Sequence, residues 1–179
     1  MSAGAAPGSH RSVPRPGDLV VGRWEARFLG RRFPCAVGFG GIGAKRGEGD
    51  GITPLGVHAL ESVLWRPDRR PRPVGRLPAR PIGPGDGWSD DPADPLYNRR
   101  VPWPSRHSAE RLRRADRLYD LVAVVDFNRN PPVAGAGSAI FLHVWKRPRK
   151  WTAGCVAFRA QDLAWILERW GPRSRLIVR

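Results

Sequence analysis

The chain has 179 residues, of which 41% are hydrophobic, and it carries a formal net charge of +15. This length and apolar content predict one folded domain and exclude a wholly disordered chain. No stretch approaches the roughly 20 consecutive apolar residues of a membrane-spanning helix, so we expect no stable membrane insertion. The 21 glycines and 19 prolines favour short strands joined by turns over a helical bundle.

The first half of the chain predicts short strands separated by loops. Residues 1–16 are rich in Gly, Ala, Pro and Ser, so we expect them to be disordered. They also lack the apolar core of a secretory signal. Residues 17–179 would then form the single domain. Short β-prone runs lie at 18–24, 33–39 and 57–65, and a glycine-rich loop lies at 38–56. The composition of residues 66–104 predicts a long loop.

The second half predicts core strands and one clear helix. Ser108 is placed to cap a short helix. Further strands are predicted at 121–127, 138–144, 151–158 and 176–178, and the first of these is continuously apolar, as in a strand buried on both faces. The clearest helix is 161–170, whose apolar residues recur at helical spacing: Leu163, Ile166, Leu167 and Trp170. The pattern as a whole predicts a mainly β fold with one or two short helices.

Residues 137–158 contain His143 and Cys155, the minimal apparatus for thiolate nucleophilic catalysis. Within this segment WKRPRKW is a palindrome about its proline. We therefore predict an antiparallel hairpin with the proline at its tip and with Trp145 opposite Trp151. Because side chains alternate along a strand, Cys155 would share a face with His143, about 7 Å away or less between Cβ atoms. A bulge would instead shift the register by one residue and place Cys155 on the other face.

Each of these features also has a plainer interpretation. A lone cysteine such as Cys155 is more often a buried structural thiol than a nucleophile. The two tryptophans and their four basic neighbours could fix the hairpin, stack on nucleic-acid bases, or attract carboxylates and help to hold a thiolate. Cys35 lies in a β-prone run and is expected to be inert, although a disulfide between Cys35 and Cys155 would block the thiol.

No metal or cofactor site is predicted. The four histidines are scattered and lack the spacing of zinc ligands. Asp90, Asp91 and Asp94 lie among prolines, where carboxylates cap turns more often than they bind a cation. The glycine-rich loop matches neither the Walker pattern nor a GxGxxG sequence between a strand and a helix.

Several stretches, in order along the chain, resemble one family: the L,D-transpeptidases with a YkuD-type catalytic domain. They are GEGDGITPLGVHAL, GWSDDPADPLYNR, SAERLRRADRLYDLVAVVDFN, GSAIFLHV and TAGCVAF, and they cover most of the chain from about Phe33 to Val178. The resemblance implies a mainly β, barrel-like or sandwich domain with its active site at the mouth.

The resemblance also implies roles for individual residues. Cys155 matches the family's acylated nucleophile, and His143 matches the histidine that activates it. The main chain at Thr152 would orient the histidine, and amides around Gly154 and Cys155 would form an oxyanion site. Substrate-binding candidates are Tyr97, Asn98, Arg99, Tyr119, Ser138, Phe141 and Trp145, although the aromatic residues Tyr97, Tyr119 and Phe141 are equally well explained as core.

The implied reaction is acyl transfer between peptidoglycan stem peptides in the periplasm, without a cofactor or nucleic acid. This chain departs from many members in having Ala153 before Gly154 and Ala157 two residues beyond the cysteine, and in a shorter separation of twelve positions from His143 to Cys155. These features resemble a compact Gram-negative branch whose acyl donor is L-Ala of the stem and whose acceptor is diaminopimelate, a 1,3-type link instead of the usual 3,3-type. The alternatives are an L,D-carboxypeptidase or endopeptidase with the same residues, and a basic non-catalytic module that binds cell wall or nucleic acid.

Overall fold

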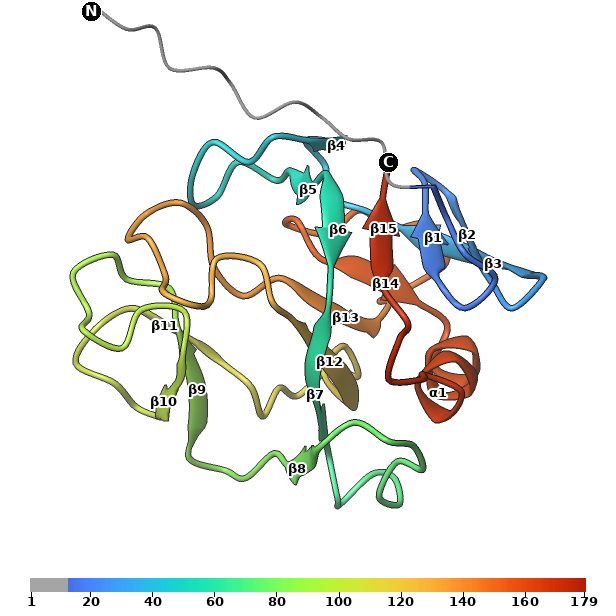
Figure 1. The fold of residues 1–179 in the computed structure, drawn as a ribbon. Helices are drawn as coiled ribbons and strands as arrows, with labels where there is room; N and C mark the ends of the chain where they lie inside the picture. Colours follow the sequence, from blue (N-terminus) through green and yellow to red (C-terminus); the bar gives the residue numbers. More distant parts are fainter. Residues whose placement is uncertain (1–12) are drawn as a thin grey trace, which may run out of the picture.

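The structure is a computed structural model that describes residues 13–179 (Figure 1). The predicted disorder of residues 1–16 therefore falls mostly outside the described residues. The strands, in chain order, are β1 (Leu19–Val21), β2 (Glu25–Phe28), β3 (Arg31–Ala36), β4 (Ile42–Gly43), β5 (Thr53–Pro54), β6 (Gly56–His58), β7 (Leu60–Trp65), β8 (Ala79–Pro81), β9 (Asp86–Ser89), β10 (Arg100–Pro102), β11 (Ala109–Arg111), β12 (Leu121–Val125), β13 (Phe141–Val144), β14 (Val156–Phe158) and β15 (Leu176–Val178). One helix, α1 (Ala160–Glu168), is present in the described part of the chain, and it is too short to span a membrane.

Ten strands form one strongly curved sheet, in the order β6-β15-β1-β2-β3-β14-β13-β12-β7-β8. Strands β6 and β7 are joined by Ala59 alone and follow one another as a single bent segment (Figure 1). Because β6 pairs with β15 while β7 pairs with β12, this segment belongs to both sides of the sheet and closes it into a barrel-like shell. The mainly β, barrel-like architecture is therefore confirmed.

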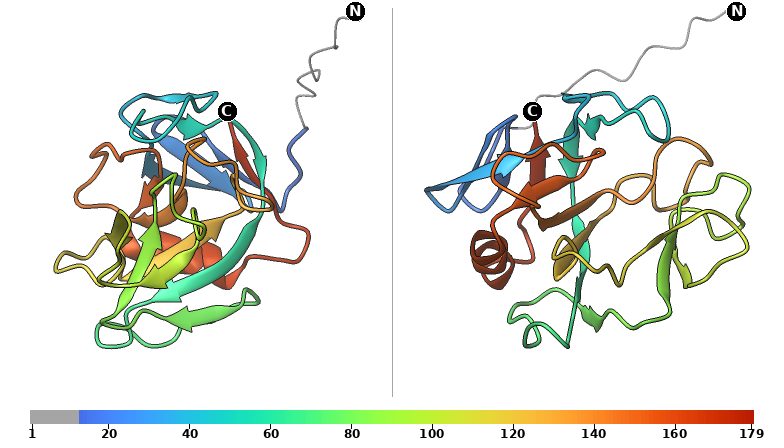
Figure 2. Two further views of the ribbon diagram at one scale, coloured as in Figure 1. Left: turned by 90° about the vertical axis from the view of Figure 1, so that its left-hand side faces the viewer. Right: turned by 180° about the vertical axis from the view of Figure 1, so that it is seen from behind.

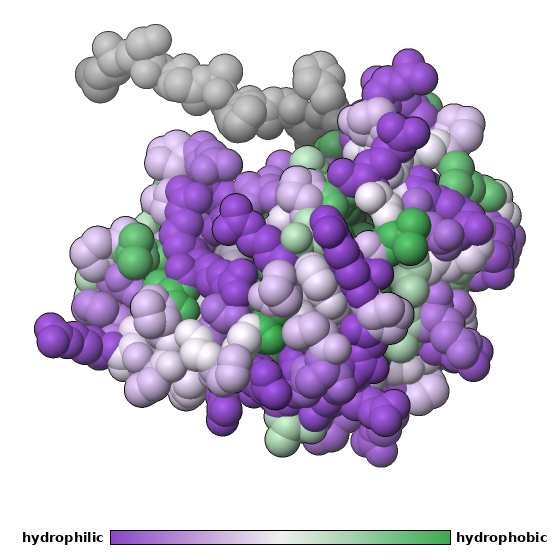
Figure 3. Space-filling view, turned by 90° about the horizontal axis from the view of Figure 1, so that it is seen from below, coloured by the Kyte–Doolittle hydropathy of each residue, from purple (hydrophilic) through white to green (hydrophobic). Residues whose placement is uncertain are grey.

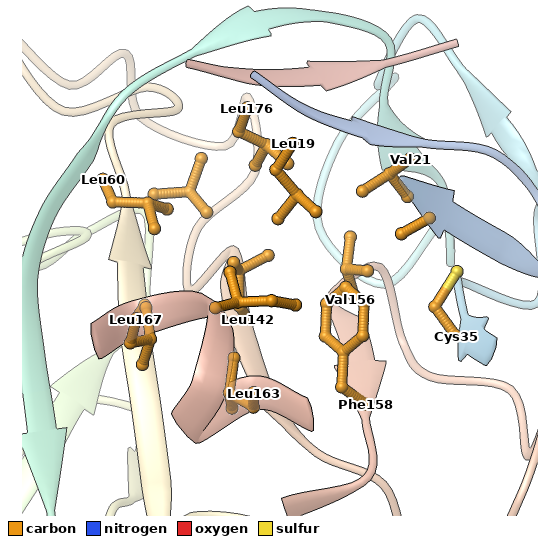
Figure 4. Close-up of a cluster of buried hydrophobic side chains, with 14 of the residues drawn as sticks. Leu19, Val21, Cys35, Leu60, Leu142, Val156, Phe158, Leu163, Leu167 and Leu176 are labelled. Atoms are coloured by element: carbon orange, nitrogen blue, oxygen red, sulfur yellow. The ribbon is translucent and has the colours of Figure 1, made fainter. Parts of the chain in front are cut away.

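An apolar cluster fills the inside of this shell, and α1 packs against one end of it (Figure 4). The predicted helix is confirmed, since Leu163, Ile166 and Leu167 form its buried face and the following Trp170 is also buried. Figure 4 shows Leu163 and Leu167 close to Leu142 of β13, with the side chains of β1, β14 and β15 around them. The continuous burial of β12 agrees with the prediction of a strand covered on both faces.

A second, smaller layer covers the outer face of β12 and β13. Strands β10, β9 and β11 form a three-stranded sheet, which lies on the opposite side of the molecule from α1 in Figure 1 and in the right-hand view of Figure 2. Trp88 of β9 packs edge-on against Phe141 of β13, with 5.0 Å between the ring centroids. Leu112 and Tyr119 join this second apolar cluster. The space between the two layers holds the candidate site.

Two local predictions in this region were wrong. Residues 109–111 form strand β11 instead of a helix capped by Ser108, because Ala109 pairs with Ser89 and the backbone hydrogen bonds go to β9. Residues 66–104 are also more regular than a loop, since they contain β8, β9 and β10. Short edge strands with Pro and Gly carry little local signal, so pairing partners decide their conformation.

The predicted hairpin around Pro148 was also wrong. Strands β13 and β14 are parallel, with His143 beside Ala157, so residues 145–155 form a crossover. Trp151 does not pair with Trp145 but packs against Trp24, with 4.4 Å between the ring centroids and 47° between the ring planes. The cause is that β14 pairs with β3 along its other edge. Just before β14, the main chain at Thr152 hydrogen-bonds to Val37 and Phe39, which follow β3. These bonds bring the chain to the β3 side of the sheet before β14 begins.

Candidate active site

His143 and Cys155 lie on the same face of the sheet, facing the smaller layer. In the parallel register Leu142 lies beside Val156 and His143 beside Ala157. Leu142 and Val156 belong to the cluster inside the shell, whereas Cys155 belongs to the cluster on the other face. Because side chains alternate, His143 and Cys155 both point away from the shell interior. The predicted shared face is therefore observed, although it arises from parallel pairing.

Both residues open onto one pocket of about 580 Å³. Its walls come from segments that are far apart in the sequence: the connection between β4 and β5, the β9–β11 layer, the approach to β13 and the crossover 145–155. The residues that line it include Lys45, Glu48, Asp90, Glu110, Tyr119, Ser138, His143, Trp145, Lys146, Lys150, Ala153, Cys155 and Ala157.

Cys155 follows a tight turn that Thr152 holds in place. The Thr152 hydroxyl donates a hydrogen bond of 2.6 Å to the Cys155 carbonyl and accepts one of 3.2 Å from the Gly154 amide. Gly154 has φ +138°, which favours glycine, and a Cβ there would lie 3.0 Å from the Ile52 carbonyl oxygen. The nucleophile candidate therefore sits at the end of a backbone turn that only glycine accommodates without strain.

The thiol of Cys155 is protonated in this arrangement. Its Sγ donates to the Ala139 carbonyl at 3.1 Å and accepts from the Phe141 amide at 3.4 Å. Burial raises the pKa of Cys155 to about 12, and the carboxylate of Glu110 acts in the same direction. The Phe141 amide and the charge of Lys45 oppose this rise. At neutral pH the residue is therefore a thiol that must pass its proton to a base before it can attack.

His143 is the base that the pocket offers. It is 4% exposed, and burial lowers the pKa of His143 to about 4, so the ring is neutral at neutral pH. Its Nδ1 lies 2.8 Å from the Val144 carbonyl oxygen. Because a carbonyl only accepts, Nδ1 carries the ring proton and Nε2 has a lone pair with which to accept one. The ring of Tyr119 packs edge-on against His143 at 5.5 Å.

The carbonyl that orients His143 differs from the one that the resemblance implied. The main chain at Thr152 was expected to do this, but the Thr152 carbonyl accepts from the Phe39 amide at 2.9 Å. The Val144 carbonyl takes the role instead. Thr152 acts on the turn that carries Cys155, through the two hydroxyl contacts described above.

Of the predicted substrate-binding residues, Tyr119, Ser138 and Trp145 line the pocket. Tyr119 is buried and donates a hydrogen bond of 2.7 Å to Glu110. Phe141 contributes to the site only through its backbone amide, which donates a hydrogen bond to Cys155 Sγ, and its ring is buried in the core. For Phe141, therefore, the core interpretation of the ring holds.

Tyr97, Asn98 and Arg99 lie behind the pocket wall instead of lining it. The Tyr97 hydroxyl donates to Glu48 and accepts from the Gly137 amide at 3.0 Å. The Asn98 Oδ1 accepts from the Ala139 amide at 3.1 Å, which fixes the residue whose carbonyl holds the Cys155 thiol. Arg99 donates to the Arg129 carbonyl at 2.9 Å. Tyr97 and Asn98 therefore support the site from outside, whereas Arg99 contacts the segment that follows β12.

The prediction missed three charged residues of the pocket, Lys45, Glu48 and Glu110, and it assigned Asp90, which also lines the pocket, to turn capping. A signal for Lys45 was present in the composition. Of the 31 basic residues only Lys45, Lys146 and Lys150 are lysines, and all three line this pocket. Of the aspartate cluster, Asp91 and Asp94 bind backbone amides two residues ahead, as turn-capping carboxylates do.

Cys35 is separate from the site. It is fully buried in β3, both cysteines are free thiols, and burial raises the pKa of Cys35 to about 12. Within residues 13–179, no group of His, Cys, Asp and Glu side chains is placed to hold a metal ion.

The family model for the L,D-transpeptidase catalytic domain, YkuD, matches residues 20–178. Among solved structures, the chain is similar to the structure of Bdellovibrio bacteriovorus Bd1075, with 14% sequence identity and a TM-score of 0.43. That match covers 90% of this chain and 47% of the other, so the chain spans about half the length of that protein. No curated protein matches the chain. The match over residues 20–178 shows that the chain belongs to the YkuD family of L,D-transpeptidase catalytic domains.

Proposed function

We propose that this protein cross-links peptidoglycan stem peptides in the periplasm through a thioester on Cys155. Family membership supports an L,D-transpeptidase-type enzyme that acts on peptidoglycan. The observation that carries the finer proposal is the arrangement of Cys155 and His143. A thiol at the end of a glycine turn and a neutral imidazole with an unprotonated Nε2 open onto the same pocket of about 580 Å³.

In the first step, His143 Nε2 takes the proton from Cys155 Sγ, and the sulfur attacks a carbonyl carbon of the donor stem. A C–S bond forms and the carbonyl oxygen becomes an oxyanion. When the oxyanion collapses, the C–N bond breaks and the leaving amine takes the proton from His143. The products are the shortened donor stem, held as a thioester on Cys155, and the released amine of the peptide that followed the cleaved bond.

In the second step, an amine of a neighbouring stem attacks the thioester carbon. The amine gives a proton to His143, the new C–N bond forms and the C–S bond breaks. The proton then returns from His143 to the sulfur. One peptide bond has been exchanged for another, and neither step needs a cofactor, an oxidant or a nucleotide.

We further propose that the acyl donor is L-Ala of the stem and the acceptor is diaminopimelate, giving a 1,3-type link. Ala153 and Ala157 both line the pocket, and Ala157 lies beside His143. The positions at which many family members carry larger polar side chains therefore present only methyl groups to the substrate. Lys146 and Lys150 remain as pocket cations that can pair with stem carboxylates.

The test is mass analysis of muropeptides after purified sacculi are incubated with the wild-type protein, Cys155→Ala or Cys35→Ala. We expect a new cross-linked dimer with the wild type and with Cys35→Ala, and none with Cys155→Ala. Fragmentation of the dimer identifies the donor residue, which should be L-Ala.

The other outcomes are equally informative. Shortened monomers without dimers would establish the carboxypeptidase or endopeptidase alternative. A dimer linked through two diaminopimelate residues would overturn the 1,3 assignment but keep the enzyme. Unchanged sacculi with every variant would contradict the enzyme and favour a binding module.

A further inference from the structure

Lys45 is buried beside the nucleophile, outside the residues that the mechanism above uses. Its side chain is 3% exposed, and its Nζ forms a 2.6 Å ion pair with Asp50, which is itself 10% exposed. The chain retains only three lysines among 31 basic residues, and this one lies in the wall of the catalytic pocket. An ammonium with so little water around it exerts a strong field on its neighbours.

Two glycines form the slot that holds Lys45. Gly137 has φ +106°, and a Cβ there would overlap the methylene stem of Lys45. A Cβ at Gly154 would lie 3.6 Å from Lys45 Nζ. The stem therefore rests on one glycine, and the ammonium lies close to the other, which directly precedes Cys155. The slot suits an unbranched chain with a compact charge better than a planar guanidinium.

Asp50 fixes Lys45 but leaves it further hydrogen bonds to donate. One carboxylate oxygen of Asp50 accepts from Lys45 and from the Ile52 amide, and the other accepts from the amides of Arg46 and Gly47. The carboxylate is therefore saturated and holds the loop rigid. An ammonium has three N–H donors, and the ion pair with Asp50 uses one.

The site has a need that Lys45 meets. The proposed reaction passes through a thiolate and an oxyanion, both of which a buried pocket disfavours. The Gly154 amide, a candidate oxyanion donor, is already hydrogen-bonded to Thr152. Glu110 adds a nearby negative charge, which disfavours the thiolate further. A fixed positive group beside Gly154 counteracts both effects.

We propose that Lys45 is a catalytic residue whose ammonium stabilises the Cys155 thiolate and the oxyanion that forms next to Gly154. It takes no part in proton transfer, so the proton path from Cys155 to His143 is unchanged. This role depends on Cys155 being the nucleophile proposed above. Its effect on the thiol, however, needs no peptidoglycan and can be measured on the free protein.

The test compares alkylation of Cys155 by iodoacetamide at about pH 8.5, followed by mass analysis of the peptide that contains Cys155. The variants are Lys45→Met, which removes the charge at similar length, and Asp50→Asn, which removes the anion that offsets it. The control is Arg46→Gln, which removes an exposed charge from the same loop. Far-UV circular dichroism and the thermal midpoint show whether each variant is folded.

We expect alkylation to slow about tenfold in Lys45→Met, to quicken in Asp50→Asn and to stay unchanged in Arg46→Gln, since one unit of thiol pKa is a tenfold change in thiolate. If Lys45 and Asp50 only clamp the loop, both variants loosen the site and shift the rate in the same direction. That result, or no change in folded Lys45→Met, would overturn the proposal.

A second measurement covers turnover. With a soluble stem-peptide substrate, Lys45→Met should lower kcat by about 10²- to 10³-fold with little change in KM, as the loss of an oxyanion donor does. If no stem peptide is turned over by the wild type, the proposed function fails while the alkylation result stands by itself. If wild type turns it over and Lys45→Met does so equally well, the role of Lys45 is refuted.

Discussion

At the scale of single residues, the site combines a thiol and an imidazole that are both uncharged at rest. Burial raises the pKa of Cys155 to about 12 and lowers the pKa of His143 to about 4. The resting pair is therefore not a thiolate–imidazolium ion pair. The basic residues at the palindrome were expected to help hold a thiolate, but the cation that lowers the pKa of Cys155 is Lys45.

The depressed pKa of His143 predicts a specific loss of stability in acid. An unfolded histidine binds a proton below about pH 6.5, whereas folded His143 binds one only below about pH 4, so the free energy of unfolding falls as the pH drops through this window. Between about pH 7.5 and pH 4.5 the loss should be about 2–3 kcal/mol. Urea denaturation at both pH values measures it.

His143→Gln is the reference for that experiment, because it cannot titrate. Carboxylates with depressed pKa values, such as Asp50, also lower the free energy of unfolding in acid, and they do so equally in both proteins. The extra loss in the wild type, relative to His143→Gln, isolates the histidine. Equal losses in the two proteins would show that His143 is not held neutral by burial.

At the scale of elements, the turn that carries Cys155 depends on close packing of glycine backbones. Gly38, just after β3, is bridged to Thr152, and its amide donates to the Thr53 hydroxyl at 2.8 Å. A Cβ on Gly38 would overlap the Gly51 carbonyl oxygen and lie 2.9 Å from the Gly154 Cα. These are main-chain atoms that cannot move without shifting the turn.

We therefore expect Gly38→Ala to destabilise the protein by about 2 kcal/mol or more and to reduce activity, because a backbone clash must be relieved. Gly43→Ala is the matched control, since its Cβ would meet only the Ile52 side chain, at 3.8 Å. The free energy of unfolding of that variant should lie within about 0.5 kcal/mol of the wild-type value. Equal urea midpoints for the two variants would contradict this close packing of main-chain atoms around Gly38.

At the scale of the whole molecule, the charge of +15 dominates encounters with an anionic polymer. The face in Figure 3 is mostly hydrophilic, with apolar side chains in separate spots and no broad apolar patch. The surface on this side therefore favours electrostatic attraction over hydrophobic docking.

Binding to purified sacculi should accordingly weaken several-fold between about 50 mM and 500 mM NaCl, because the screening length falls below 10 Å. Turnover of a small soluble stem peptide should change less, since its contacts lie within the pocket. Pelleting assays and initial rates measure the two quantities. A bound fraction that does not respond to salt would show that charge does not drive the encounter.

The sequence by itself determined the features that depend on local pattern or on motif. The helix at 161–170 and the strand at 121–127 follow from periodic or continuous apolar residues. The motifs around His143 and Cys155, together with GEGDGITPLGVHAL and the other matching stretches, identified the family and its fold. The tertiary structure alone decided what depends on pairing partners. It set β14 parallel to β13 because β3 takes its other edge, turned 109–111 into a strand of the second sheet, and brought Lys45 and Glu110 to a thiol more than 40 positions away in the chain. Such contacts leave no local pattern, because the free energy that selects them comes from backbone hydrogen bonds and burial between segments that are distant in sequence.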